Sequence, residues 1–246
     1  MKFGLIGYPL SHSFSQNYFT EKFRQSGLDD FSYDLLPIQT EEGFASVMRG
    51  DYFGLNVTIP HKSAILKYVN DIDPTALQIG ALNTLVRTGK YSWKGYNTDV
   101  LGFTDSLLAW YGDEMLPDQA LVLGSGGSSK AVCFALQQLG ITTTIVSSSG
   151  AGLLSYNDLN KAIINQHRLI INTTPVGMMP DEMKCPPVPY DYISPKHRAF
   201  DLIYNPLNTL FLSQSESNGA KTKNGLDMLY KQADHAWLIW KQHGKF

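Results

Sequence analysis

Short apolar segments alternate with segments of helical periodicity along this chain of 246 residues, and the alternation starts twice. A strand–helix–strand–helix–strand order is typical of parallel βαβ units, so the sequence predicts an α/β protein. In the first round we expect strands at 3–7, 31–38 and 54–59, helices at 13–25, 41–48, 62–69 and 74–79, and a hairpin made of 81–87 and 91–96.

The second round follows a long predicted helix at 99–111 and a loop that contains Pro117. An apolar strand at 120–123 ends in a glycine turn, and a helix at 129–139 comes next. We therefore expect two α/β units with a boundary near residues 100–118. Beyond the turn, the sequence predicts strands at 141–146, 169–172 and 199–203, a helix near Asn157 and a long helix at 225–243.

The glycine turn, which runs from Gly124 to Ser128, has the context of a dinucleotide-binding site because a strand precedes it and a helix follows. Glycines permit a tight turn and a close approach of the backbone to a pyrophosphate. The unpaired N–H groups at the start of the helix attract that anion. Ser129 replaces the third glycine of the usual fingerprint, and a plain tight turn is the alternative interpretation.

The next strand ends in Val146 and three serines, at the place where such a fold reads the adenosine ribose. No acidic residue stands there to bind a free 2′-hydroxyl, and no arginine stands there to bind a 2′-phosphate. The interval before the helix near Asn157 is too short for a complete βαβ unit. We therefore expect this half of the nucleotide-binding fold to be shortened.

Polar residues gather in three segments where packing alone does not require them. A cation is unfavourable at the positive end of a helix, so Lys62 at a predicted helix start favours a functional role. Ser11 or Ser13 can instead cap the helix that follows, and Asp99 is favourable in a first helical turn by charge alone. The three segments are 11–13, 56–62, and 83–84 with 95–99.

Together and in this order, these motifs resemble those of the shikimate dehydrogenase family. The resemblance implies an N-terminal α/β substrate domain and a Rossmann-like dinucleotide-binding domain, with the C-terminal helix returning to the first domain. It places the substrate domain at 1–101 and 222–246 and the nucleotide domain at 102–221. The matching segments extend over nearly the whole chain: 7–13, 56–62, 80–84, 95–103, 124–128, 172–178, 201–204 and 225–232.

The family reduces 3-dehydroshikimate reversibly to shikimate in aromatic amino acid biosynthesis, usually with NADPH. The resemblance implies that Lys62 is the general acid/base and that Asp99 is its partner. A lysine suits this role because hydride delivery to a ketone leaves negative charge on oxygen, which an ammonium stabilises and protonates. The resemblance also implies substrate-binding roles for Ser11, Ser13, Asn56, Thr58, Asn83, Tyr204 and Gln232.

The cofactor implied is NADP, with NAD as the alternative. NADP is favoured because no acidic residue has replaced the missing arginine, and Lys130 on the neighbouring helix is a candidate substitute for it. We expect weaker binding of NADP than is usual in the family. The implied cofactor contacts are Gly124, Ser125, Gly126, Gly127 and Ser128 at the pyrophosphate, Ser147 and Ser148 at the adenosine end, and Thr173, Leu202 and Gly225 near the nicotinamide.

Composition argues against several other classes. The net charge is −2 without a basic cluster, which disfavours nucleic-acid binding, and no apolar run approaches the roughly 18 residues of a membrane span. Two distant cysteines without metal-ligand spacing are typical of reduced thiols rather than a metal site. We expect a cytoplasmic monomer or homodimer.

Two alternative functions remain open from the sequence. One is a quinate/shikimate dehydrogenase with relaxed cofactor choice. The other is a non-catalytic sensor that binds shikimate. A sensor has no need of a proton-transfer pair, and this chain keeps both Lys62 and Asp99.

Overall fold

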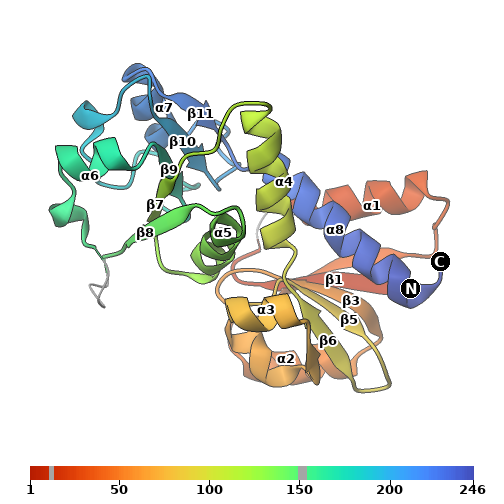
Figure 1. Cartoon of the computed structure of the whole chain (residues 1–246). Helices are drawn as coiled ribbons and strands as arrows, with labels where there is room; N and C mark the ends of the chain where they lie inside the picture. The colour runs from red at the N-terminus through yellow and green to blue at the C-terminus, as the bar shows by residue number, and fades with distance from the viewer. Residues whose placement is uncertain (11–13, 149–153) are drawn as a thin grey trace. The chain divides into compact units, whose positions relative to one another are not determined.

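The computed structural model describes residues 1–10, 14–148 and 154–246. These residues form two compact units, one made of 1–98 with 233–246 and the other of 99–232. Each unit is built on its own sheet (Figure 1). The assignment of substrate binding to 1–101 with 222–246, and of cofactor binding to 102–221, stays a prediction.

The first unit contains a six-stranded mixed sheet with the order β2-β1-β3-β5-β6-β4. β1 lies parallel to both β2 and β3, whereas β5 is antiparallel to β3 and β6. The predicted parallel units and the predicted hairpin are therefore confirmed. The strands are β1 (Lys2–Gly7), β2 (Ser32–Pro37), β3 (Tyr52–Val57), β4 (Asp71–Ile72), β5 (Thr84–Arg87) and β6 (Trp93–Tyr96).

The helices of this unit are α1 (Phe14–Gln25), α2 (Glu42–Arg49), α3 (Pro74–Ile79), the 3-10 helix η1 (Ala64–Tyr68) and the later part of α8 (Leu226–Gly244). The ends of α3 follow from its sequence. The carboxylate of Asp73 accepts from the N–H groups of Thr75 and Ala76, and Pro74 supplies a helical φ. Gly80 ends the helix in the left-handed region at φ +67°.

The helix predicted at 62–69 is wrong in type and extent, because the structure has only the five-residue η1 there. Hydrogen bonds to other segments hold the backbone on both sides of η1. The N–H of Leu82 donates to the carbonyl of Lys62 at 2.7 Å, and the N–H of Asn70 donates to the carbonyl of Trp93 at 3.0 Å. A segment held this closely on both sides has room for a short, tight helix only.

The end of the chain completes the core of the first unit. Ala233, Ala236, Trp237 and Trp240 of α8 pack among buried residues of β1, α1 and β2. The Trp240 indole lies over Gly54, where an added Cβ would come within 2.5 Å of its Nε1, and that nitrogen donates to the carbonyl of Leu85. The predicted return of the C-terminal helix to the first unit is thus confirmed.

The second unit contains a five-stranded parallel sheet with the order β11-β10-β9-β7-β8. Its strands are β7 (Gln119–Leu123), β8 (Thr142–Val146), β9 (Leu169–Asn172), β10 (Arg198–Asp201) and β11 (Lys221–Lys223). Its helices are α4 (Asp99–Tyr111), α5 (Gly127–Gln138), α6 (Lys161–Gln166), α7 (Leu210–Ser217) and the start of α8, with 3-10 turns η2 (Tyr156–Asp158) and η3 (Tyr190–Tyr192).

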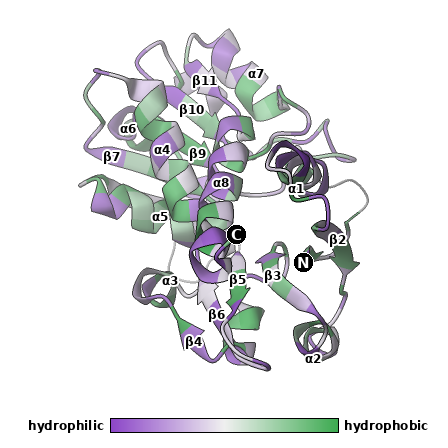
Figure 2. Ribbon diagram, turned by 90° about the vertical axis from the view of Figure 1, so that its right-hand side faces the viewer, coloured by the Kyte–Doolittle hydropathy of each residue, from purple (hydrophilic) through white to green (hydrophobic). Residues whose placement is uncertain are grey.

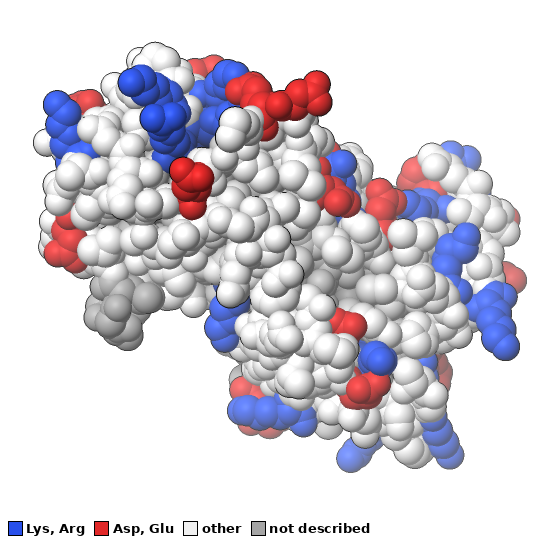
Figure 3. All heavy atoms as spheres, viewed as in Figure 1, with Lys and Arg blue, Asp and Glu red and all other residues white. Residues whose placement is uncertain are grey.

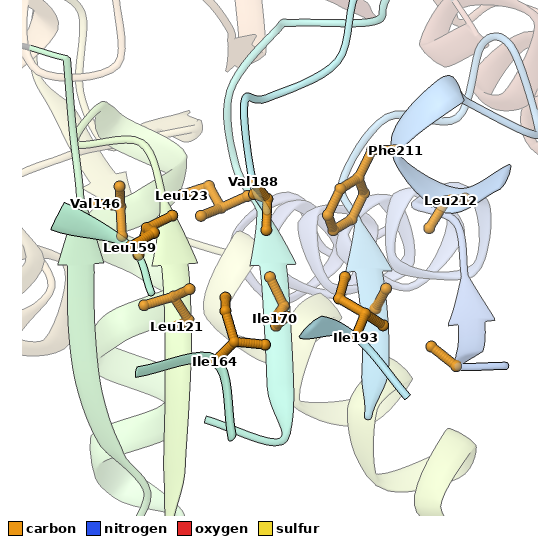
Figure 4. Packing of buried hydrophobic residues seen from close by; sticks show 12 residues of the cluster. Leu121, Leu123, Val146, Leu159, Ile164, Ile170, Val188, Ile193, Phe211 and Leu212 are labelled. Carbon is orange, nitrogen blue, oxygen red and sulfur yellow. The ribbon is translucent and has the colours of Figure 1, made fainter. Parts of the chain in front are cut away.

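Parallel strands covered on both faces are apolar along their length, and β9 shows this in Figure 2. One face of the sheet packs Leu121, Leu123 and Ile170 against residues of the crossover segments, which include Ile164 and Phe211 (Figure 4). By contrast, α1 is largely hydrophilic and buries only Phe19 and Phe23.

The first half of the parallel sheet is short, as expected. A doubly wound nucleotide-binding sheet has three strands in each half. Beyond β8 the described residues contribute one isolated parallel bridge, between Val146 and Leu154, in place of a full strand.

On the face shown in Figure 3, Lys and Arg side chains are interspersed with Asp and Glu rather than gathered by sign. No helix within the described ranges has both the length and the apolar character that crossing a membrane requires.

Candidate functional site

In the first unit, buried amides and hydroxyls meet where β3 ends and β5 begins. Asn56 is the register partner of Thr84. Its Oδ1 accepts from the Tyr33 hydroxyl at 2.7 Å, and its Nδ2 donates to the Asn83 carbonyl and to Thr84 Oγ1, both at 3.2 Å. Both amide hydrogens of Asn56 are therefore used, and the capacity that remains is an acceptor lone pair on Oδ1.

Asn83 connects this network to the start of α4. Its Oδ1 accepts from the backbone N–H of Thr98 at 2.7 Å, and its Nδ2 donates to Thr98 Oγ1 at 2.9 Å. Asn83 is 3% exposed and Thr98 1%. Asp99, which follows Thr98 and opens α4, is also buried. The buried hydrogen bonds between Asn83 and Thr98 therefore fix the backbone of Asp99, the next residue in the chain.

Lys62 lies in the turn between β3 and η1 and is half-buried. Its carbonyl is tied to Leu82, as described above. η1 starts only at Ala64 and is five residues long, so Lys62 lies outside a short helix with a small dipole. The unfavourable interaction of the Lys62 charge with a helix N-terminus is therefore weaker than predicted. Lys62 is therefore a candidate catalytic residue because of its position after β3, and not because of the dipole.

The residue before it, His61, is buried and structural. Its Nε2 lies 2.6 Å from the carbonyl of Ile38. A carbonyl oxygen only accepts, so Nε2 carries the hydrogen. Thr58, at the end of β3, is half-buried and donates its N–H to the carbonyl of Ile6 at 2.8 Å. Ser11 and Ser13, predicted to bind substrate, lie outside the described residues.

In the second unit, the glycine turn fits a pyrophosphate. Gly124 has φ +107°, and an added Cβ would lie 2.8 Å from Thr173 Oγ1, so both conformation and space favour glycine. Gly126 stands at the N-cap of α5, and a Cβ added there would meet no atom of the described residues within 4 Å. The turn therefore leaves open space in front of the first N–H groups of a twelve-residue helix.

The residues predicted to contact the adenosine end, Ser147 and Ser148, are neutral. The hydroxyls of Ser125 and Ser147 lie 3.0 Å apart, and Ser147 is buried. Ser148 is exposed, as is Lys130 in the first turns of α5. The chain carries no charged residue from 131 to 157. Ser147 and Ser148 thus fit a ribose hydroxyl. A 2′-phosphate bound there could accept hydrogen bonds from their hydroxyls, but neither β8 nor these serines would supply a positive charge.

Three predicted cofactor residues, Thr173, Leu202 and Gly225, meet at the carboxyl ends of β9 and β10. Leu202 donates its N–H to the carbonyl of Asn172, the residue before Thr173, at 3.0 Å. A Cβ added to Gly225 would lie 2.0 Å from the Leu202 carbonyl oxygen, so only glycine permits this approach. Ligands bind outside the carboxyl ends of strands in open α/β sheets, which agrees with this placement.

The remaining predicted residues, Tyr204 and Gln232, are both half-buried. Burial raises the pKa of the Tyr204 hydroxyl, so this group stays neutral and able to donate. Gln232 lies on α8, and its Nε2 donates to the carbonyl of Leu229 at 2.8 Å. A Cβ added to Gly102 would come within 2.8 Å of Gln232, which shows how closely α8 packs on α4.

A buried carboxylate, Asp201, and its neighbour Asn172 were given no role from the sequence, where each only belongs to a motif. Asp201 is fully buried at the end of β10. Burial raises the pKa of its carboxyl group to about 6, against the effect of hydrogen bonds from Thr209, Ile203 and Asn172. The one sequence signal was an acidic residue that directly ends an apolar strand.

Comparison with known proteins shows similarity along nearly the whole chain. A family model described as shikimate dehydrogenase substrate binding domain matches residues 5–85. A shikimate dehydrogenase (NADP(+)) from Caldanaerobacter subterraneus is 35% identical, covering 97% of this chain and 90% of that protein.

Solved structures extend the similarity. A shikimate 5-dehydrogenase from Thermus thermophilus, in complex with NADP(H) and shikimate, superposes with a TM-score of 0.85 at 30% identity, covering 98% of this chain and 94% of that one. The Listeria monocytogenes enzyme, in complex with shikimate and NAD, gives 0.81 at 26% identity, covering 98% and 91%.

The raised pKa of Asp201 predicts a pH dependence of stability. Because the folded pKa of about 6 exceeds the ordinary 3.8, the folded protein binds more protons, and this group's contribution to the free energy of unfolding falls as pH rises between those values. We expect wild type to lose up to roughly 3 kcal/mol relative to Asp201→Asn over this range, at about 1.4 kcal/mol per pKa unit. Urea denaturation of both proteins at several pH values measures the difference. A difference that is constant or rises with pH would contradict the assignment.

Proposed function

This chain belongs to the shikimate dehydrogenase family, and from that premise we infer that it catalyses the reversible NADPH-dependent reduction of 3-dehydroshikimate to shikimate in the shikimate pathway. The observation that carries this function is the similarity over nearly the whole chain to a shikimate dehydrogenase (NADP(+)). The chain also has the lysine, the aspartate and the glycine turn that the resemblance requires. A fold alone would not identify the reaction.

The cofactor would be held by the second unit. The turn from Gly124 to Ser128 would receive the pyrophosphate, Ser147 and Ser148 would contact the adenosine end, and Thr173, Leu202 and Gly225 would contact the nicotinamide half. When bound, NADPH supplies the hydride.

Lys62 is the proposed acid and base. In the direction of reduction, Nζ of Lys62 donates a proton to the ketone oxygen as that oxygen gains negative charge, and in oxidation it takes the proton back. Asp99 is its proposed partner. A carboxylate beside an ammonium stabilises the charged form of the lysine, which is the form that donates.

The first unit supplies most of the proposed substrate contacts, and Tyr204 and Gln232 belong to the second unit. Asn56 retains only acceptor capacity, so it suits a substrate hydroxyl, which donates. Thr58, Asn83, Tyr204 and Gln232, with Ser11 and Ser13, complete the proposed set. A cytoplasmic location and a monomeric or homodimeric state remain predictions.

Replacing either member of the proposed proton-transfer pair tests the catalytic assignment. We expect Lys62→Ala and Asp99→Asn each to lower kcat for shikimate oxidation by about 100-fold or more, because proton transfer in the transition state is lost. Lys67→Ala is the matched control, since Lys67 is an exposed lysine five residues away in η1. Near-normal turnover in either active-site variant would disprove its role.

Gly126 offers a test of the pyrophosphate site. A methyl group at this position meets no atom of the described residues, so Gly126→Ala should lower the thermal unfolding midpoint only slightly, because alanine is a poorer N-cap residue than glycine. It should weaken NADP⁺ binding by about tenfold, because the methyl takes space that the bound pyrophosphate needs. Calorimetric titration measures the affinity. Unchanged affinity would mean that the open space in front of α5 is not the binding site.

Cofactor choice follows from the adenosine end. We expect kcat/KM to favour NADP over NAD, because no acidic residue repels the 2′-phosphate. We also expect the NADP advantage to shrink in Lys130→Ala and at high salt, since an exposed cation is screened. Oxidation of shikimate and of quinate, each with both cofactors, gives the measurement. Equal kcat/KM values with NADP and NAD would contradict the proposed NADP preference. Faster oxidation of quinate than of shikimate would show that quinate is the better substrate.

A further inference from the structure

The carboxylate of Asp201 is buried among neutral partners at the end of β10. It accepts hydrogen bonds from Asn172 Nδ2 at 3.0 Å, from the N–H of Ile203 at 3.0 Å and from Thr209 Oγ1 at 2.6 Å. The residue is 0% exposed. A charge held in such a place costs stability, and its hydrogen bonds offset only part of that cost. An apolar side chain would fill the space without this cost, so the carboxylate is placed for its three directed bonds.

Asn172 is the register partner of Asp201 on the neighbouring strand β9. While its Nδ2 donates to Asp201, its Oδ1 accepts from the N–H of Thr174 at 3.0 Å and from the Thr174 hydroxyl at 2.6 Å. One side chain therefore fixes the loop after β9 and links it to Asp201.

Asp201 fixes the loop after β10 at both of its ends. The bond from Ile203 holds the start of the loop, and Thr209, whose Oγ1 also accepts from the N–H of Leu212, holds the end at the N-cap of α7. The N–H of Gly225 donates to the Ile203 carbonyl at 3.0 Å. A shift of Ile203 would therefore move Gly225 and Leu202 together.

We propose that Asp201 and Asn172 form a positioning pair that sets the two loops holding the nicotinamide half of the cofactor. This proposal rests on the proposed function, which assigns Thr173, Leu202 and Gly225 to that half. The pair does not touch the reacting atoms. It acts through the backbone of residues 173–174 and 202–203, which it ties to the ends of two adjacent strands. Thr173 and Thr174 also lie against Gly124, so the pair bears on the turn after β7 as well. Ser147 and Ser148, the proposed adenosine contacts, follow β8, which β7 separates from β9 in the sheet.

The experiment compares two ligands that differ in the nicotinamide half. NADP⁺ has it, whereas 2′,5′-ADP has only the adenosine and its phosphates. Calorimetric titration of Asp201→Ala should show about tenfold weaker NADP⁺ binding and a much smaller loss of 2′,5′-ADP binding, since that ligand reaches only the edge of the loop after β9. Asp201→Asn should retain most of the NADP⁺ affinity. Its Oδ1 can accept from Ile203 and Asn172, and its Nδ2 can donate to the Thr209 oxygen once that hydroxyl turns.

A control variant lies at the opposite end of the same strand. His197, just before β10, is buried, and its Nε2 lies 3.0 Å from the carbonyl of Ile164. His197→Ala removes a buried polar contact from the same strand and should lower the unfolding midpoint while leaving NADP⁺ binding unchanged. If Asp201→Ala does not fold, Thr209→Val removes one of the three bonds and should weaken NADP⁺ binding in the same selective way.

Several results would overturn the positioning role. These are unchanged NADP⁺ binding in Asp201→Ala, an equal loss of affinity for both ligands, or an equal loss of NADP⁺ affinity in His197→Ala. If Asp201→Asn loses as much NADP⁺ affinity as Asp201→Ala, the hydrogen-bond geometry is not what matters. A wild-type protein that binds neither ligand would instead refute the proposed function itself.

Discussion

Where a strand leaves its sheet, backbone N–H groups lose their ladder partners, and the side chains at the strand ends replace them. Asn83 accepts from the backbone of Thr98, Asn172 from that of Thr174 and Asp201 from that of Ile203. A buried N–H without a partner is costly, so these amides and this carboxylate are first of all parts of the fold. Asn172 and Asp201 also stand at the carboxyl ends of parallel strands, where α/β proteins bind ligands, and Asn83 stands at the start of β5, beside the end of β3. The same side chains thus satisfy the backbone and set the loops of the site.

The two networks differ in charge. The first unit joins Asn56, Asn83, Thr84 and Thr98 entirely through neutral groups, which can be buried at modest cost when all bonds are made. The second unit places a carboxylate among neutral donors, and burial shifts the pKa of Asp201 toward neutrality. A neutral network holds its geometry over a wide pH range. A network centred on one carboxylate loses an acceptor when that group is protonated.

Local signals in the sequence predicted much of the fold. The apolar run before Gly124 and the glycine turn predicted β7 and α5, and Gly89 between two β-rich segments predicted the β5–β6 hairpin. The short elements were placed poorly or missed for physical reasons. The structure has the three-residue η2 where a helix near Asn157 was predicted, and α6 begins only at Lys161, because six residues are too few to show a period. β11, a three-residue polar edge strand, was missed. Lys62 was expected to begin an α-helix because the sequence does not reveal that Leu82 binds its carbonyl.

The candidate site likewise has residues that the sequence predicts and residues that only the folded structure reveals. Glycines are visible in a sequence, and Gly124, Gly126 and Gly225 were identified there. The Asp201–Asn172 bond joins residues 29 positions apart, and burial of the carboxylate depends on helices that cover the sheet. No local pattern reports either fact.

The packing of Trp240 over Gly54 also bears on how the chain matures during synthesis. The core around Phe3 needs residues of α8 that follow the whole second unit in the chain, whereas the second unit is continuous in sequence. Translation therefore exposes an unfinished apolar surface on the first sheet until α8 emerges, while the parallel sheet has all its strands earlier. A nascent chain that stops before α8 would carry that surface uncovered, which makes such fragments targets for chaperones and proteases.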